Sequence, residues 1–94
     1  MAATELAAKG YQQLTVSNTA LSFTKPDGYT TKAIVMIETE SIRYRDDGTA
    51  PTASVGTLVE APASIEVIGS ALDRFKMIRA TGTDAAVSVN YYGF

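Results

Sequence analysis

The chain has 94 residues, of which 46% are hydrophobic and 19% charged, and ten acidic against eight basic side chains give a formal net charge of −2. This length permits a single domain, and the chain has neither the positive balance nor the basic run that attracts nucleic acid. Because the sequence contains no histidine and no cysteine, it excludes Ser-His and Cys-His catalysis, disulfide bonds, and metal sites built on those ligands.

The first ten residues are expected to form an arm or a short turn, followed by one domain over residues 11–94. Residues 2–9 are the only stretch that favours a helix, with Thr4 as a candidate N-cap and Gly10 as a stop. So short a helix is marginal by itself in water. Two interpretations stay open: a turn or mobile arm, and an arm that becomes ordered against a neighbouring subunit.

After the arm the hydrophobic period becomes two, which indicates half-buried β-strands. Leu14 and Val16 share one face of the first expected strand, and Leu21 and Phe23 share one face of the second. Residues 25–28, Lys-Pro-Asp-Gly, favour a turn, because proline fixes the first corner and glycine accepts positive φ.

The middle of the chain contains two more expected strands. Ala33–Ile37 is a continuous apolar run of strand length, which predicts a central strand covered on both faces. In the next strand Ile42 and Tyr44 alternate with Arg43 and Arg45, so that the arginines occupy the opposite face.

A tight turn and a loop follow this strand. Asp47-Gly48 is a strong tight-turn pair, and Gly48 is expected to hold a positive φ. Pro51 excludes ladder pairing at its own position, so residues 51–56 are expected to form a loop.

The remaining residues predict four short strands and one helical turn. The strands are expected over residues 56–60, 64–68, 75–79 and 87–92, and the turn over residues 69–74. Met77 and Ile78 are adjacent and break the alternation, so this strand has either a bulge or two-sided burial. In the last strand Tyr91 is expected to face the core.

Seven or eight short strands without a long helix predict an all-β fold, either an antiparallel β-sandwich or a small jelly-roll-like barrel. No apolar run approaches the roughly 18 residues that a membrane span requires. The first residues lack the basic and apolar regions of a signal peptide. We therefore expect synthesis in a cytoplasm and no membrane partner.

Two clusters of carboxylates are candidate chemical sites. Glu38 and Glu40 have a spacing that a glycosidase pair could use, but a small sandwich offers little cleft, and a solvated strand end is preferred. Asp46, Asp47 and Thr49 carry oxygen ligands suitable for Ca²⁺, but they lack the ligand spacing of an EF-hand loop, and a turn cap is preferred. No metal, cofactor or catalytic residue is predicted.

Basic and aromatic side chains are the candidate partner-binding groups. If Arg43, Arg45 and Lys76 share an outer sheet face, they suit an acidic protein surface; ordinary solubilising charge is the alternative. Tyr92 and Phe94 are expected to be partly exposed, which is typical of a partner surface. Sugar stacking and burial under a neighbouring loop are the alternatives for this pair. With the turn included, the candidate partner-binding residues are Arg43, Arg45, Asp46, Asp47, Thr49, Lys76, Tyr92 and Phe94.

The chain resembles small structural proteins of tailed bacteriophages from residue 41 onward. Residues 42–52, I-R-Y-R-D-D-G-T-A-P-T, are similar to the "I-R-Y-R-x-D-G-T-x-P-T" segment of those proteins. Residues 75–92 are similar to their final hairpin, of the type "F-x-x-I-R … T-D-A-x-x-x-V-x-Y-Y". The first 40 residues match no pattern of this kind.

The resemblance implies a virion component made in the host cytoplasm, in particular a head decoration (cement) protein that binds the major capsid protein or another virion protein. It also implies a homo-oligomer, with a trimer favoured, and no catalytic residues. The expected contacts are the arm over residues 2–9, the loop over residues 45–52, and the terminal aromatic residues. A head–tail or tail accessory subunit and a carbohydrate-binding adhesion module are the alternatives, and an enzyme is the least favoured.

Overall fold

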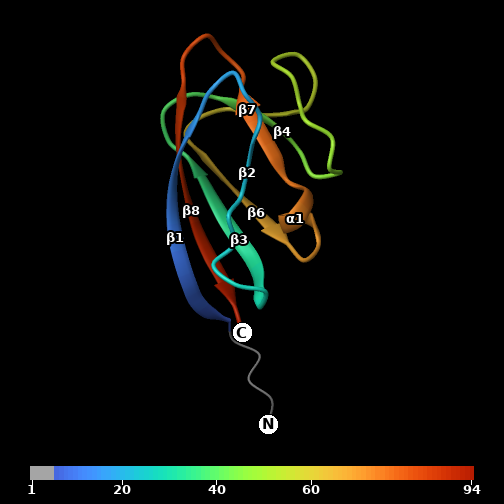
Figure 1. Cartoon of the computed structure of the whole chain (residues 1–94). Helices are drawn as coiled ribbons and strands as arrows, with labels where there is room; N and C mark the ends of the chain where they lie inside the picture. The colour runs from blue at the N-terminus through green and yellow to red at the C-terminus, as the bar shows by residue number, and fades with distance from the viewer. Residues whose placement is uncertain (1–5) are drawn as a thin grey trace.

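Alternating apolar side chains fold residues 6–94, the part of the chain that the computed structural model describes, into two antiparallel sheets (Figure 1). Sheet A has the strand order β1-β8-β3-β6, and sheet B has the order β2-β7-β4-β5. The elements are β1 (Ala7–Val16), β2 (Leu21–Ser22), β3 (Thr30–Ile37), β4 (Ile42–Arg45), β5 (Thr57–Val59), β6 (Ala63–Ile68), α1 (Ala71–Arg74), β7 (Lys76–Arg79) and β8 (Ala85–Gly93). The all-β sandwich predicted from the sequence is confirmed.

One hydrophobic core fills the space between the two sheets. Val35 of β3 and Val89 of β8 are fully buried from the sheet A side, and Met77 of β7 is fully buried from the sheet B side. The Phe75 ring stacks on the Phe23 ring, with centroids 4.6 Å apart. Face-to-face burial of this kind is what gives so short a chain a sufficient core.

Tyr91 lies in this core, as its position on the last strand predicted. It is 1% exposed, and its hydroxyl donates a hydrogen bond of 2.6 Å to Oε1 of Gln12. Burial raises the pKa of the Tyr91 hydroxyl above its usual value, because the charged phenolate is poorly solvated there.

The sheet begins earlier than the sequence predicted. Residues 7–10 belong to β1 rather than to a helix, turn or arm, and Ala7 pairs with Gly93 of β8. The expected arm over residues 1–10 is therefore wrong for these four residues, and residues 1–5 lie outside the described part of the chain. Long-range pairing with β8 overrides the local helix preference of alanine and lysine.

The apolar run in β3 is central in its sheet but covered on one face only. β3 lies between β8 and β6, and Ala33, Val35 and Ile37 on its inner face are all 0% exposed. On its outer face Met36 is 41% exposed. The predicted cover on both faces is therefore wrong for residues 6–94, because no described element packs against the outer face of β3.

Two-sided burial, rather than a bulge, explains the adjacent Met77 and Ile78 of β7. Their pairing with β4 runs without a register shift. Met77 faces the core at 0% exposure, and Ile78 faces outward yet is only 9% exposed. Pro51 of the loop that follows β4, itself buried, lines one cavity with Ile78, so this loop folds over the outside of sheet B.

Helical structure is confined to α1 among residues 6–94, in the predicted turn over residues 69–74. No helix in this described part is long and apolar enough to cross a membrane.

Candidate functional site

The eight residues selected from the sequence lie on two opposite faces of the sandwich. Six belong to sheet B or the loop after β4: Arg43, Arg45, Asp46, Asp47, Thr49 and Lys76. Tyr92 and Phe94 belong to sheet A or follow directly after it. The structure therefore does not bring the eight together into one site, and each face needs its own account.

Arg43, Arg45 and Lys76 share the outer face of sheet B, as the sequence analysis expected. Arg45 is paired directly with Lys76, and Arg43 is paired with Ile78, in the register between β4 and β7. Their neighbours Ile42 and Met77 point the other way and are fully buried. We call this surface, defined by the two arginines and Lys76, the basic face.

Arg43 fastens the loop of residues 46–56, which we call the contact loop. Its Nε donates to the carbonyl oxygen of Ala53 at 3.0 Å, and its Nη1 donates to that of Gly56 at 2.9 Å. Gly56 has φ of 137°, and an added Cβ there would lie 3.1 Å from the Tyr44 carbonyl oxygen. The guanidinium is thus used inside the chain to hold the contact loop.

Asp47 organises the first turn of the contact loop. Its Oδ1 accepts hydrogen bonds from Nε of Arg45 and from the backbone N–H of Thr49, each at 3.1 Å. The hydrogen bond from Arg45 holds the pKa of Asp47 below its usual value and raises that of Arg45. Gly48 has φ of 89°, which confirms the positive φ expected there. The preferred reading of this segment as a turn cap therefore agrees with the structure.

The far end of the contact loop is closed by a second turn. The backbone N–H of Thr52 donates to the Val55 carbonyl oxygen at 2.9 Å, and the N–H of Val55 donates to Oγ1 of Thr52 at the same distance. Val55 is nevertheless 54% exposed. The contact loop is thus fixed from within while it presents side chains to solvent, and it stands out from the sandwich in Figure 1.

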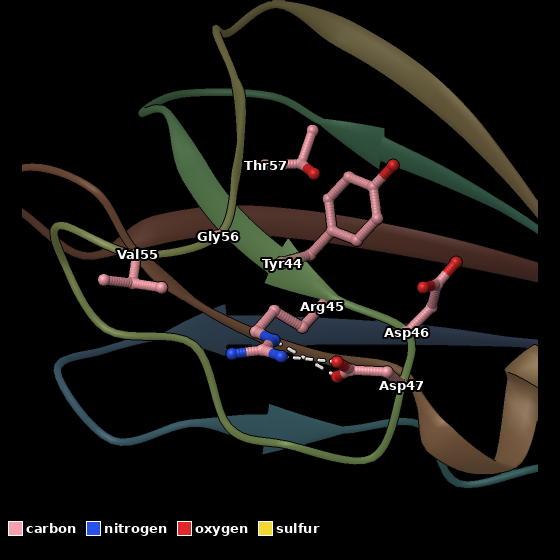
Figure 2. A pocket seen from close by; sticks show the side chains of 7 residues that line it. All are labelled: Tyr44, Arg45, Asp46, Asp47, Val55, Gly56 and Thr57. Carbon is pink, nitrogen blue, oxygen red and sulfur yellow. Dashed lines mark hydrogen bonds and ion pairs between the residues drawn. The ribbon is translucent and has the colours of Figure 1, made fainter.

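A cavity of about 410 Å³ lies between the contact loop and β4 (Figure 2). The Arg45 guanidinium and the Asp47 carboxylate face each other in it, while the Asp46 carboxylate points away from this pair. The lining residues are Tyr44, Arg45, Asp46, Asp47, Val55, Gly56 and Thr57. Arg45 and Asp47 neutralise each other, so the Asp46 carboxylate leaves the lining with one unpaired negative charge. No cluster of three metal-ligating side chains occurs within residues 6–94. The arrangement offers polar contacts rather than an activated nucleophile or base.

Lys76 is the cation of the basic face that stays available. Arg43 bonds to loop carbonyl groups and Arg45 pairs with Asp47, whereas Lys76 takes part in none of the ion pairs within the described residues. The net attraction of this face for an acidic partner is therefore smaller than three basic residues suggest.

The outer face of sheet A is apolar and aromatic, and we call it the aromatic face. Its exposed members include Tyr11 of β1 at 60%, Met36 of β3 at 41% and Ile68 of β6 at 60%. Tyr92 of β8 is half-buried in the same face, because it alternates with the inward-facing Tyr91. Of these four residues, only Tyr92 was predicted from the sequence to be exposed.

One charged pair lies in the aromatic face. Nζ of Lys32 is 3.1 Å from Oε2 of Glu66 on the neighbouring strand β6, and it lies 5.9 Å from the centre of the Tyr92 ring. Lys32 is therefore held by an anion and an aromatic ring together. This pairing leaves the centre of the face without net charge.

Phe94 and Tyr29 lie at the edge of sheet A where β8 ends and β3 begins. The backbone N–H of Phe94 donates to the Tyr29 carbonyl oxygen at 3.1 Å, and the two side chains are 63% and 71% exposed. Nζ of Lys9 contacts the Phe94 carbonyl oxygen and the Asp27 carboxylate, both at 2.8 Å. The hydrogen bond from Lys9 holds the pKa of Asp27 below its usual value of 3.8. The expected exposure of Phe94 is confirmed.

The missed members of the aromatic face share a signal in the sequence. On each strand an apolar residue occupies an outward position that a half-solvated sheet normally fills with a polar one. In β3 the outward apolar residues make the run over residues 33–37 continuous, and such a run predicts a strand that is buried on both faces. The run correctly marked an apolar outer face, but residues 6–94 do not cover it.

Comparison with known proteins found no family model, no curated protein and no solved structure that matches this chain.

Proposed function

We propose that this chain is a non-enzymatic structural subunit of a tailed-bacteriophage particle, a decoration (cement) protein that binds the capsid and stabilises the head shell. Its partner is the major capsid protein or another virion protein, and its place is the virion. The proposal includes no cofactor, no nucleic-acid contact and no membrane contact.

The observation that carries the proposal is the contact loop. The residues that resemble phage structural proteins form β4 and this loop, and their arginine and aspartate fasten it through Arg43 and Asp47. A loop that is ordered before binding loses little conformational entropy when a partner covers it. Rigid scaffolds commonly present their binding residues in this way.

The arrangement suits many weak contacts on one particle. Thr52 and Val55 of the contact loop offer a hydrogen-bonding and an apolar group, and Lys76 offers a cation on the same side of the sandwich, which supports modest affinity at each copy. Copies that bind adjoining subunits of a shell act together, so modest single contacts suffice to stabilise it. A small domain also gains stability from such association.

The test is cosedimentation of the purified protein with emptied phage heads from which accessory proteins have been removed, with bound copies counted per particle. Saturation at the number of symmetry positions of the shell supports a decoration protein. Val55→Glu in the contact loop should weaken binding at least tenfold, whereas Thr83→Glu, in the exposed β7–β8 connection, should not change it. Absence of binding by the folded wild-type protein would contradict the proposal and favour a tail or adhesion role.

A carbohydrate-binding adhesion module is the second candidate, and the aromatic face favours it. Tyr11 and Tyr29 are 60% and 71% exposed, and tyrosine rings stack on sugars. A specific glycan that shifts tyrosine fluorescence, with loss of the shift in Tyr11→Ala, would support this second function. A decoration protein should show no such shift.

A further inference from the structure

We propose that the aromatic face joins two copies of this chain, with sheet A of one copy packed on sheet A of the other around a two-fold axis. The inference goes beyond the proposed function, because it concerns the face opposite the contact loop and holds whichever particle or surface that loop binds.

β3 has the composition of a strand buried on both sides. Its inner residues are fully buried, while Ile34 and Met36 on the outer side have no described element over them. Tyr11 on β1 and Ile68 on β6 extend this apolar surface to both edges of the sheet. An exposed apolar patch that crosses four strands is typical of an association surface.

The charge of the aromatic face favours a second copy of the chain as its partner. The Lys32–Glu66 pair at 3.1 Å is the only ion pair formed across the aromatic face within residues 6–94. The Glu38 carboxylate, which bonds to Ser88, is a second anion on this face, directly after β3. The middle of the face therefore holds one cation beside one anion and gives a strongly charged partner little net attraction. A second copy presents the same balanced pair, and a two-fold axis allows each lysine to approach the other copy's glutamate without excess like charge.

The area of the aromatic face can be compared with the area that a dimer interface needs. Four strands spaced about 4.8 Å apart make a face roughly 19 Å wide, and seven residues of β8 at about 3.3 Å each give roughly 23 Å of length. The projected area is then about 440 Å² on each copy, or close to 900 Å² for two, before the relief of the side chains is added. Specific interfaces begin near roughly 1,000 Å² of total buried surface. The projected area falls just below that value, so the relief of the side chains supplies the remainder and the expected dimer is a weak one.

The polar residues of the face are compatible with such packing. Ser88 is 5% exposed and donates to Oε2 of Glu38 at 3.2 Å, so its hydroxyl is already satisfied. Gln13 and Asn90 are uncharged and can exchange water for hydrogen bonds across the axis. The Glu38 carboxylate that accepts the Ser88 hydrogen bond follows directly after β3 and is exposed, so it has to stay at the solvated rim when the face is covered.

The experiment is sedimentation equilibrium of the full chain from about 1 to 200 μM, in the micromolar range where moderate interfaces dissociate. We expect a dimer of twice 10.0 kDa. Met36→Glu places a carboxylate in the centre of the interface and should weaken dimerisation at least 100-fold. Leu58→Glu is the matched control, because Leu58 is 43% exposed against 41% for Met36 but lies on sheet B. Circular dichroism of both variants checks their fold.

A second readout does not depend on adding a buried charge. The chain has no cysteine, so single Met36→Cys and Leu58→Cys variants can be labelled with a maleimide without background. Cys at position 36 should react more slowly as the protein concentration rises, and Cys at position 58 should react at a constant rate.

The outcomes separate this inference from the proposed function. A monomer at 200 μM, a trimer, or a dimer that survives Met36→Glu but is lost in Leu58→Glu would overturn the inference, even if the protein binds heads. A dimer that is lost in Met36→Glu and kept in Leu58→Glu supports the inference, even if the protein fails to bind heads.

Discussion

Gly93 occupies a position at the end of β8 where the structure leaves no room for a side chain. It is paired with Ala7 of β1 on one side and with Thr30 of β3 on the other. A Cβ at this position would lie 2.1 Å from the Tyr29 carbonyl oxygen and 2.8 Å from the Thr30 Cα. Both are backbone atoms, so no change of rotamer can relieve the overlap.

The cost of Gly93→Ala follows from the two ways of relieving this overlap. Shifting the packed backbone costs roughly 1–3 kcal/mol, as other overpacked sites do. Separating Gly93 and Phe94 from Tyr29 breaks the 3.1 Å hydrogen bond between Phe94 and Tyr29, and loses about 0.5–1.5 kcal/mol for each such bond. We expect a loss of about 2 kcal/mol, which lowers Tm by about 8–16 °C in a domain of this size.

Thermal unfolding followed by circular dichroism measures this effect, with Gly82→Ala as the control. A Cβ at Gly82 would meet no atom within 4 Å, and Gly82 is not among the glycines with positive φ. That control should leave Tm unchanged or raise stability by up to about 1 kcal/mol, because alanine has fewer unfolded conformations than glycine. If the Tm of Gly93→Ala equals the Tm of Gly82→Ala, the close packing of β8 against Tyr29 is refuted.

Two further predictions concern polar contacts. Arg43→Met should destabilise the fold by about 1–2 kcal/mol and speed amide exchange at Val55, because the contact loop loses two hydrogen bonds. The control Arg45→Met removes only a surface ion pair and should leave Tm unchanged. Equal effects of the two variants would contradict the role of Arg43 in holding the contact loop. In an NMR titration the pKa of the Asp27 carboxyl should lie below 3.8 and should return toward that value in Lys9→Met. Because the pKa is lowered in the folded state, the Lys9–Asp27 contact stabilises the fold above about pH 4, and this stabilisation is lost as the pH falls through the lowered pKa. An Asp27 titration midpoint that Lys9→Met does not change would contradict the contact with Lys9.

Local chemistry made several features predictable from the sequence. Period-two alternation gave the strands and placed Tyr91 in the core, because successive side chains of a strand point to opposite faces. The Asp47-Gly48 turn followed from conformations that only a few residue types adopt easily. Alternation around Ile42 and Tyr44 also placed the two arginines on one outer face.

Features that depend on distant partners were not predictable in this way. The helix preference of residues 7–10 is outweighed by pairing with β8, more than 80 residues away. Ile78 is buried by a loop whose path over sheet B no local pattern specifies. Arg43 looked like a surface charge until the contact loop brought two carbonyl groups to it.

The sequence by itself determined the all-β class, the approximate strands, the principal turn and the side chains available for contacts. Only the tertiary structure decided how those side chains are divided, with Tyr92 on the aromatic face, Phe94 directly after β8, and the basic residues on the opposite face. The physical reason is that alternation and turn chemistry act over a few residues, whereas strand order and register determine which faces are covered and which stay open to a partner.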